Sequence, residues 1–126
     1  MEVFTLLFLI VGLLFAHFVA DFICQNDYVA INKSKYLPVL ALHVVIYAVV
    51  LAAASATLGS VLGTLAVGNF FLFLGINSLS HFLVDFFTSR ANSYLWKANR
   101  HWFFCMIGFD QFLHAAILVL TVPLLL

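Results

Sequence analysis

The amino-acid sequence predicts an all-α membrane protein that forms a bundle of four transmembrane helices. Two observations predict this class. Hydrophobic residues make up 66% and charged residues only 8% of the 126-residue chain, whereas a soluble domain carries about 25% charged residues. The apolar residues also form four stretches near the length of roughly 20 residues that a transmembrane helix needs. The chain length favours a single transmembrane domain over residues 1–126.

The four predicted spans cover residues 3–23, 38–58, 65–87 and 102–125. The first lacks the basic start and the cleavage site of a secretory signal, so we expect it to be retained. Pro38 begins the second span, where its missing N–H costs no hydrogen bond. The stretches do not alternate with period two, and open sheet edges are not tolerated in lipid, so membrane-spanning strands are excluded.

The positive charges predict the orientation of the four spans. They lie only in the first and third predicted loops, at Lys33, Lys35, Arg90, Lys97 and Arg100. The second loop has no charge, and the N-terminal end carries only Glu2. The positive-inside rule therefore places the first and third loops in the cytoplasm and both termini outside. We expect a multi-pass protein of the inner (plasma) membrane.

The sequence also predicts two tandem helix-hairpin repeats, in residues of about 1–58 and 65–126. "HFVADF" at His17 matches "HFLVDF" at His81, and "LHVVI" at Leu42 matches "LHAAI" at Leu113, in the same order. Repeats of two spans each share one orientation, so a pseudo-two-fold axis along the membrane normal should relate them. The spacing of the matches predicts a longer third loop over residues 88–101.

Histidine and aspartate side chains gather at the predicted cytoplasmic ends of all four spans. Within a span they are spaced four apart, which places an imidazole and a carboxylate on one helical face. Ionisable groups within a membrane usually face the bundle interior and a partner. The predicted metal ligands are His17, Asp21, His43, His81, Asp85, Asp110 and His114.

Neutral imidazole and carboxylate suit Zn²⁺, Mn²⁺ and Fe²⁺. Seven candidates exceed the four ligands of one zinc ion and suit two ions bridged by a carboxylate. The absence of glutamate from the set favours zinc over a di-iron centre. Asp21, Asp85 and Asp110 are the candidates for a bridging ligand or a catalytic base. The polar neighbours expected to orient the ligands or a substrate are Gln25, Tyr47, Asn77 and Gln111.

Other interpretations of this set remain open. A metal-free His/Asp relay would serve proton or ion transport, and a metal-ion transporter would use the same ligands. Paired histidines could hold haem, although haem does not explain the aspartates. A membrane subunit with a structural metal is a further alternative. The outer halves of the spans carry few polar residues, which favours a pocket over a pore.

The motifs "HFVADFICQND", "NKSK", "HFLVD" and "DQFLH" occur in this order along the chain. In this combination the chain resembles a family of small bacterial and phage integral membrane proteins of unknown function. The resemblance covers roughly residues 15–116 and implies no activity. The residues that match its pattern are His17, Asp21, Gln25, Asn32, Lys33, His43, His81, Asp85, Asp110, Gln111 and His114.

We therefore expect a metal-dependent hydrolase at the cytoplasmic interface. A metal-activated water would attack an ester, a phosphoester or an amide. The lipid bilayer is the expected partner, with a lipid or membrane-associated substrate, and a homodimer is compatible with so small a bundle. The formal net charge of zero gives no indication of nucleic-acid binding.

Overall fold

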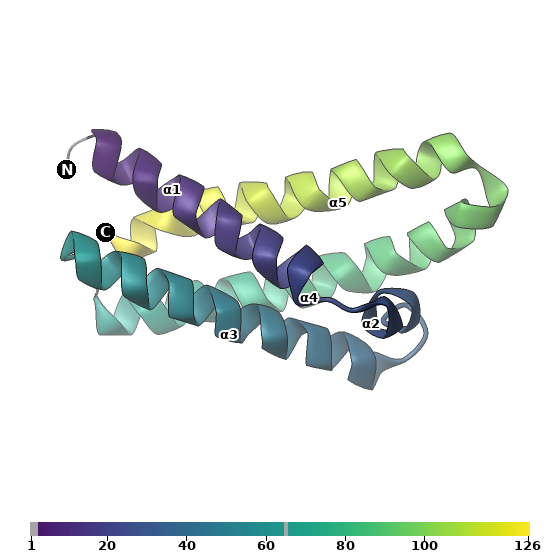
Figure 1. Cartoon of the computed structure of the whole chain (residues 1–126), viewed down its shortest axis with the longest axis horizontal. Helices are drawn as coiled ribbons and strands as arrows, with labels where there is room; N and C mark the ends of the chain where they lie inside the picture. The colour runs from purple at the N-terminus through teal and green to yellow at the C-terminus, as the bar shows by residue number, and fades with distance from the viewer. Residues whose placement is uncertain (1–2, 65) are drawn as a thin grey trace.

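The computed structural model describes residues 3–64 and 66–126, and every regular element in these ranges is a helix (Figure 1). The predicted orientation depends in part on Glu2, and the predicted third span begins at Leu65. Both residues lie outside the described residues. In chain order the elements are α1 (Val3–Phe18), a π-helical turn (Val19–Ile23), α2 (Asp27–Asn32), α3 (Leu37–Leu62), α4 (Val67–Ala98), α5 (Arg100–Thr121) and a 3₁₀ turn (Val122–Leu125).

Four helical segments within the described residues are long and apolar enough to cross a membrane. They are Val3–Ile23, Leu37–Leu62, Val67–Ala98 and Arg100–Leu125. These segments confirm the predicted all-helical class and the prediction of four helices that are long and apolar enough to span a membrane. They are consistent with a multi-pass membrane protein. The orientation and the tandem repeat stay predictions.

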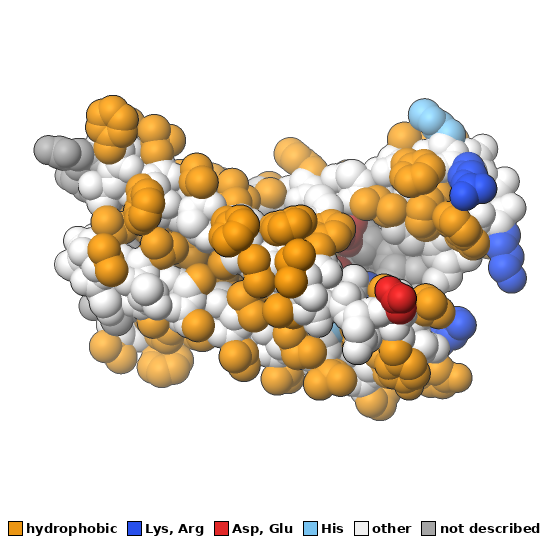
Figure 2. All heavy atoms as spheres, viewed as in Figure 1, with side chains coloured by type: hydrophobic (Ala, Val, Ile, Leu, Met, Phe, Trp, Pro, Cys, Tyr) orange, Lys and Arg blue, Asp and Glu red, His pale blue; other side chains and the backbone are white. Residues whose placement is uncertain are grey.

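The four long helices pack as a bundle in which each contacts its neighbours. Contacts join α1 with α3, α3 with α4, α4 with α5 and α1 with α5. The start of α1, the end of α3, the start of α4 and the 3₁₀ turn lie at one end, while α2 and the α4–α5 turn lie at the other (Figure 1). Figure 2 shows apolar side chains over the face of the bundle that is in view, as expected for a surface in contact with lipid.

The half of the bundle nearer the termini has an apolar core. Leu9, Leu13, Leu51, Phe73 and Leu118 are fully buried there and belong to one cluster of contacting side chains. The buried polar side chains that the structure describes in this half, Ser55 and Asn77, are uncharged and hydrogen-bonded. The ionisable residues therefore lie in the other half, toward α2 and the α4–α5 turn.

The predicted third loop over residues 88–101 is wrong, because α4 continues to Ala98. Asn99 alone separates α4 from α5, and its side-chain Oδ1 accepts a hydrogen bond from the Trp102 backbone N–H at 3.1 Å. The stretch "TSRANSYLWKA" contains neither glycine nor proline, so nothing ends the helix where the apolar run ends. Hydropathy marks the apolar part of a helix, and α4 is longer than that part.

The connection between α1 and α3 is ordered by local hydrogen bonds. The π-helical turn follows α1 directly, and the Cys24 N–H donates to the Val19 carbonyl at 2.8 Å. Asn26 then caps α2, because its Oδ1 accepts from the Val29 N–H at 2.9 Å. Lys33 follows α2 as its C-terminal cap residue. This short helix holds Lys33 over the end of the bundle that contains the ionisable residues.

Candidate metal centre

Each of the four long segments contributes histidine, aspartate or both to one buried cluster. His17 lies in the last turn of α1, and Asp21 lies in the π-helical turn. α3 contributes His43, α4 contributes His81 and Asp85, and α5 contributes Asp110 and His114. The structure thus brings together all seven residues that the sequence singled out as metal ligands.

The π-helical turn affects where Asp21 points. A π-helical turn contains one more residue than an α-helical turn, so side chains after it are rotated from the α-helical phase. Asp21 Oδ1 lies 3.0 Å from His43 Nε2 and 3.4 Å from His81 Nε2. Its contact with His17 on its own helix is longer, at 3.7 Å. Asp21 is therefore directed toward α3 and α4 more than toward its sequence neighbour.

The centre of the cluster is a group of two imidazoles and two carboxylates. Asp21, His43, His81 and Asp85 each offer one ligand atom, and these four atoms lie within 4.8 Å of one another. His43 Nε2 lies 3.1 Å from His81 Nε2 and 3.2 Å from Asp85 Oδ2. All four residues are at most 3% exposed. Two nitrogens and two oxygens are a ligand set suited to a tetrahedral zinc ion or to a similar divalent metal.

A second group of ligand atoms shares one residue with the first. Asp21, Asp110 and His114 each offer an atom, again within 4.8 Å of one another. His114 Nε2 lies 3.1 Å from Asp85 Oδ1 and 3.5 Å from Asp110 Oδ1. Asp21 thus belongs to both groups, and the two oxygens of Asp85 face different histidines. Carboxylates in such positions are able to bridge two metal ions.

His17 belongs to neither of these groups, although it lies within the cluster. Its Nε2 is 3.1 Å from Gln111 Oε1, and its ring packs against the ring of His114 with centroids 5.3 Å apart. The buried His17 ring therefore contributes packing, a hydrogen bond with Gln111 and a longer contact with Asp21 to the cluster. Its place as a metal ligand rests on the sequence prediction.

Ring packing holds the histidines of the centre. Tyr47 stacks on His81 with centroids 3.9 Å apart, and His81 stacks on His114 at 4.1 Å. The Nδ1 atoms of His17, His43 and His81 have no hydrogen-bond partner within residues 3–64 and 66–126. Metal-ligating histidines usually donate their second ring N–H to an acceptor. Here stacking, rather than such a hydrogen bond, orients His81.

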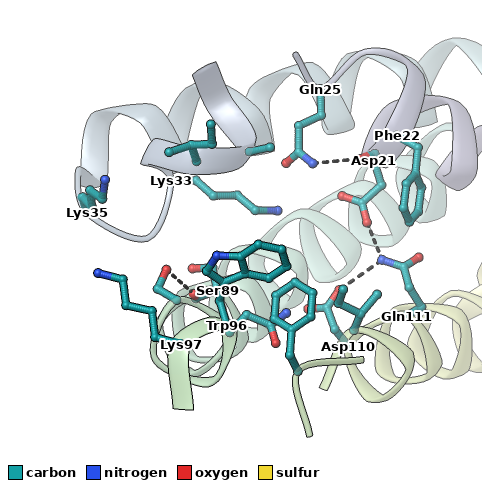
Figure 3. Close-up of a pocket in the computed structure, with 16 residues that line it drawn as sticks. Asp21, Phe22, Gln25, Lys33, Lys35, Ser89, Trp96, Lys97, Asp110 and Gln111 are labelled. Atoms are coloured by element: carbon teal, nitrogen blue, oxygen red, sulfur yellow. Dashed lines mark hydrogen bonds between the residues drawn. The ribbon is translucent and has the colours of Figure 1, made fainter. Parts of the chain in front are cut away.

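Gln111 links the carboxylates of the two groups. Its Nε2 donates to Asp21 Oδ2 at 2.6 Å and to Asp110 Oδ2 at 3.0 Å (Figure 3). Thr88 Oγ1 donates to the other oxygen of Asp110 at 2.5 Å. These donors hold Asp21 and Asp110 in place, as residues that surround metal ligands do.

The other two polar neighbours named from the sequence lie differently. Gln25 Nε2 donates to the backbone carbonyl of Asp21 at 3.1 Å and does not contact its carboxylate. Asn77 lies one turn before His81 and donates to Thr121 Oγ1 at 2.8 Å and to the Phe73 carbonyl. Gln25 thus supports the backbone at Asp21, and Asn77 links α4 to α5 away from the cluster.

Lys33 was not among the predicted metal ligands, because its charge was attributed mainly to membrane orientation, yet it lies in the cluster. Its Nζ donates to Asp85 Oδ2 at 2.8 Å, and its side chain is 13% exposed. The signal that could have found it is its position in the "NKSK" motif, which accompanies the His/Asp motifs. Hydropathy could not reveal the contact, because it depends on the fold of α2.

A pocket of about 620 Å³ reaches the cluster from the end of the bundle that carries α2. Asp21, Lys33, Asp110 and Gln111 line it together with residues of α2 and α4 (Figure 3). Figure 2 shows a hollow toward this end, with an acidic side chain visible inside it and basic side chains beyond it at the tip of the bundle. A small molecule therefore has access to Asp21 and Asp110 from outside the bundle.

Comparison with known proteins shows which family the chain belongs to. The family profile described as "Protein of unknown function (DUF3307)" matches residues 8–125. The match covers nearly the whole chain, so the chain belongs to this family. No curated protein and no solved structure matches the chain.

Proposed function

We propose that this member of the DUF3307 family is an integral membrane metalloprotein that hydrolyses a membrane-associated ester, phosphoester or amide. The site would bind one or two divalent metal ions, with zinc preferred over manganese and iron. One observation carries the proposal. Four ligand atoms from Asp21, His43, His81 and Asp85 converge within 4.8 Å in a fully buried position.

The charges of the cluster support a bound cation. Three carboxylates, from Asp21, Asp85 and Asp110, face a single ammonium group from Lys33. With neutral histidines, two formal negative charges are left in the membrane-spanning part of the chain. Buried charge without a partner is costly there. One divalent cation would neutralise both charges, and neutral imidazoles are the form of histidine that binds metals.

The geometry argues for a compact metal site rather than for haem. The Nε2 atoms of His43 and His81 lie 3.1 Å apart, with carboxylate oxygens of Asp21 and Asp85 within 3.7 Å. A haem held between two axial histidines needs space for its macrocycle between the rings. Oxygen ligands fill the surroundings of these two nitrogens instead.

The pocket is the reason to propose catalysis rather than a structural metal. Asp110 lines the pocket and also belongs to the second ligand group. A divalent metal would supply a Lewis acid and an activated water. Asp110 is then placed to accept a proton from a water molecule. The oxygen of that water forms the new bond to the carbonyl carbon or the phosphorus of the substrate. The bond to the leaving group breaks, and the leaving oxygen or nitrogen receives that proton.

A transport function fits the bundle less well. A conducting path would have to continue from the cluster toward the end that holds the termini. Leu51, Phe73 and Leu118 are fully buried in that half. Asn77 and Thr121, which are polar, bond to each other there. The site is therefore better suited to a substrate that enters and leaves on one side.

The test uses the full-length protein purified in detergent and loaded with zinc. Hydrolysis of ester, phosphoester and peptide substrates is compared between the wild type and Asp110→Asn, while elemental analysis follows bound zinc. The proposal predicts turnover of one substrate class and a loss of at least about a hundredfold in Asp110→Asn, as expected for a general base. Both proteins should retain zinc at the group of Asp21, His43, His81 and Asp85, to which Asp110 does not belong. A zinc-loaded wild type that is inert on all three classes would contradict it.

A further inference from the structure

The pocket beside the metal centre has a size that suits a small polar group. Its volume of about 620 Å³ lies within the range of roughly 300–1,000 Å³ that is typical of small-molecule sites. It is bounded by the α2 connection on one side and by α4 and α5 on the other (Figure 3). Its lining combines lysines, unpaired polar atoms and apolar side chains. Each of these features limits the chemical class of ligand that the pocket would bind.

The lysines indicate an anionic group. Lys33, Lys35 and Lys97 all line the pocket. Lys33 is paired with Asp85, whereas Lys35 and Lys97 are exposed and form no ion pair with any described residue. Figure 3 shows Lys35 and Lys97 together at one side of the pocket, away from Asp21 and Asp110. An ammonium group is a common ligand of phosphate, so a phosphate would lie at this side.

Three buried polar atoms in the lining indicate hydroxyl groups on the same ligand. Gln25 Oε1, Ser89 Oγ and Asn92 Oδ1 are buried and have no hydrogen-bond partner in the described part of the chain. Buried polar atoms are almost always paired, so such atoms need an explanation. Two of the three are amide oxygens, which only accept hydrogen bonds. A ligand with hydroxyl donors would satisfy the two amide oxygens, whereas a bare phosphate would only accept a hydrogen bond from the Ser89 hydroxyl.

The remaining wall of the pocket is apolar. Phe22, Ile31, Trp96, Phe103 and Ile107 contribute to it. Phe22 and Trp96 are about half exposed, at 47% and 51%, in segments that would meet lipid. Tryptophan is enriched where the bilayer meets water. Such a wall would accommodate the glycerol backbone and the first part of the acyl chains of a lipid.

We propose that the pocket binds an anionic phospholipid whose headgroup carries free hydroxyl groups, as phosphatidylglycerol does. The phosphate lies at Lys35 and Lys97, and the headgroup hydroxyls donate to Gln25 and Asn92. The acyl chains leave the pocket along its apolar wall. Lipid binding does not depend on the proposed function, because the headgroup contacts lie outside the metal-ligand set. Only hydrolysis of the bound lipid would rest on the proposed function.

The test measures lipid binding to the full-length protein in detergent by native mass spectrometry. The probes are phosphatidylglycerol, phosphatidic acid, phosphatidylethanolamine and phosphatidylcholine with identical acyl chains, together with water-soluble glycerol 3-phosphate. We expect phosphatidylglycerol to bind about tenfold more tightly than the two zwitterionic lipids and clearly more tightly than phosphatidic acid. Equal binding of the four lipids overturns the inference, and so does glycerol 3-phosphate that binds as tightly as phosphatidylglycerol.

Variants connect the preference to the pocket. Lys35→Gln with Lys97→Gln should weaken phosphatidylglycerol binding about tenfold. Asn92→Ala should reduce the preference over phosphatidic acid. The matched control is Arg90→Gln, because Arg90 donates to the Phe86 carbonyl at 2.6 Å and does not line the pocket. An equal loss in Arg90→Gln would overturn the inference.

Parallel elemental analysis separates this inference from the proposed function. Zinc bound at the centre together with equal affinity for all lipids overturns only the lipid assignment. A phosphatidylglycerol preference in a protein that never binds zinc overturns only the metalloprotein proposal and supports the pocket assignment.

Discussion

Lys33 Nζ lies 2.8 Å from Asp85 Oδ2, although the two residues are 52 positions apart in the sequence. α2 carries the lysine to the end of the bundle, and α4 presents the aspartate from within a segment that is long and apolar enough to cross a membrane. The ammonium group thus shares a carboxylate oxygen with His43 Nε2, which lies 3.2 Å from it. Lys33 and a metal ion would therefore compete for Asp85.

Removing the Lys33 charge should make the cluster bind zinc more tightly. In Lys33→Met the repulsion between the ammonium and the metal is lost, and we expect zinc affinity to rise roughly tenfold or more. Without metal the same variant should be less stable, because Asp85 loses its buried partner. Thermal unfolding in detergent, with chelator or with zinc, measures both effects.

Lys35→Met is the control for this prediction, because Lys35 is exposed and does not contact Asp85. It should leave the stability without metal and the zinc-induced rise in Tm unchanged. A zinc-induced rise in Lys33→Met no larger than in the wild type would show that the lysine and the metal do not share this carboxylate.

Removing one central imidazole should release the metal while the bundle stays folded. In His81→Ala we expect bound zinc to fall below about half of the wild-type amount, because a tetrahedral site retains only three of its four ligands. Elemental analysis after gel filtration measures the zinc, and circular dichroism checks the helical content. His101→Ala is the control, since His101 is exposed in α5 outside the cluster. Equal zinc in the two variants would place the metal elsewhere.

Gln111 should tune the metal affinity without being a ligand. Gln111→Leu removes the donors to Asp21 and Asp110 and the contact with His17. Loss of such supporting contacts typically costs about 10–100-fold in metal affinity, and we expect a loss in this range with zinc still bound at saturation. Competition titration with a zinc indicator measures it. Gln25→Leu, which touches only the Asp21 backbone, serves as the comparison, and an equal loss there would argue against a specific role of Gln111.

The helical continuation of α4 also makes a prediction. Ser93 lies inside α4, in the stretch that hydropathy assigns to a loop. Proline in a helix interior removes a hydrogen bond and costs about 3 kcal/mol, so Ser93→Pro should lower the Tm markedly. Ser93→Ala removes only the hydroxyl contacts to Ser34 and the Ser89 carbonyl and should change the Tm little. Similar Tm values for the two variants would mean that this stretch is not helical.

The sequence alone was sufficient to predict the four spans and the gathering of histidine and aspartate in one cluster. The length of an apolar stretch predicts a span directly. Two residues that lie four positions apart, such as His81 and Asp85, are predicted to share one helical face. Both are local properties of a helix.

The features that the sequence did not reveal depend on contacts between elements. Lys33 reaches Asp85 only because α2 folds over the end of the bundle. The π-helical turn at Asp21 has no distinct composition, and the polar end of α4 resembles a loop in hydropathy. Gln111 was expected to have a supporting role, but its links to both Asp21 and Asp110 required the packing of α5 against α1.

X-ray absorption at the zinc edge of zinc-loaded, detergent-purified protein tests the central claim most directly. The account predicts a first shell of nitrogen and oxygen atoms at about 2.0–2.2 Å, with outer-shell scattering from two or more imidazole rings that weakens in His81→Ala. Sulfur ligands at about 2.3 Å, or a spectrum that is the same in His81→Ala, would contradict it. Either result would show that zinc binds at a cysteine or at the surface rather than in the His/Asp cluster.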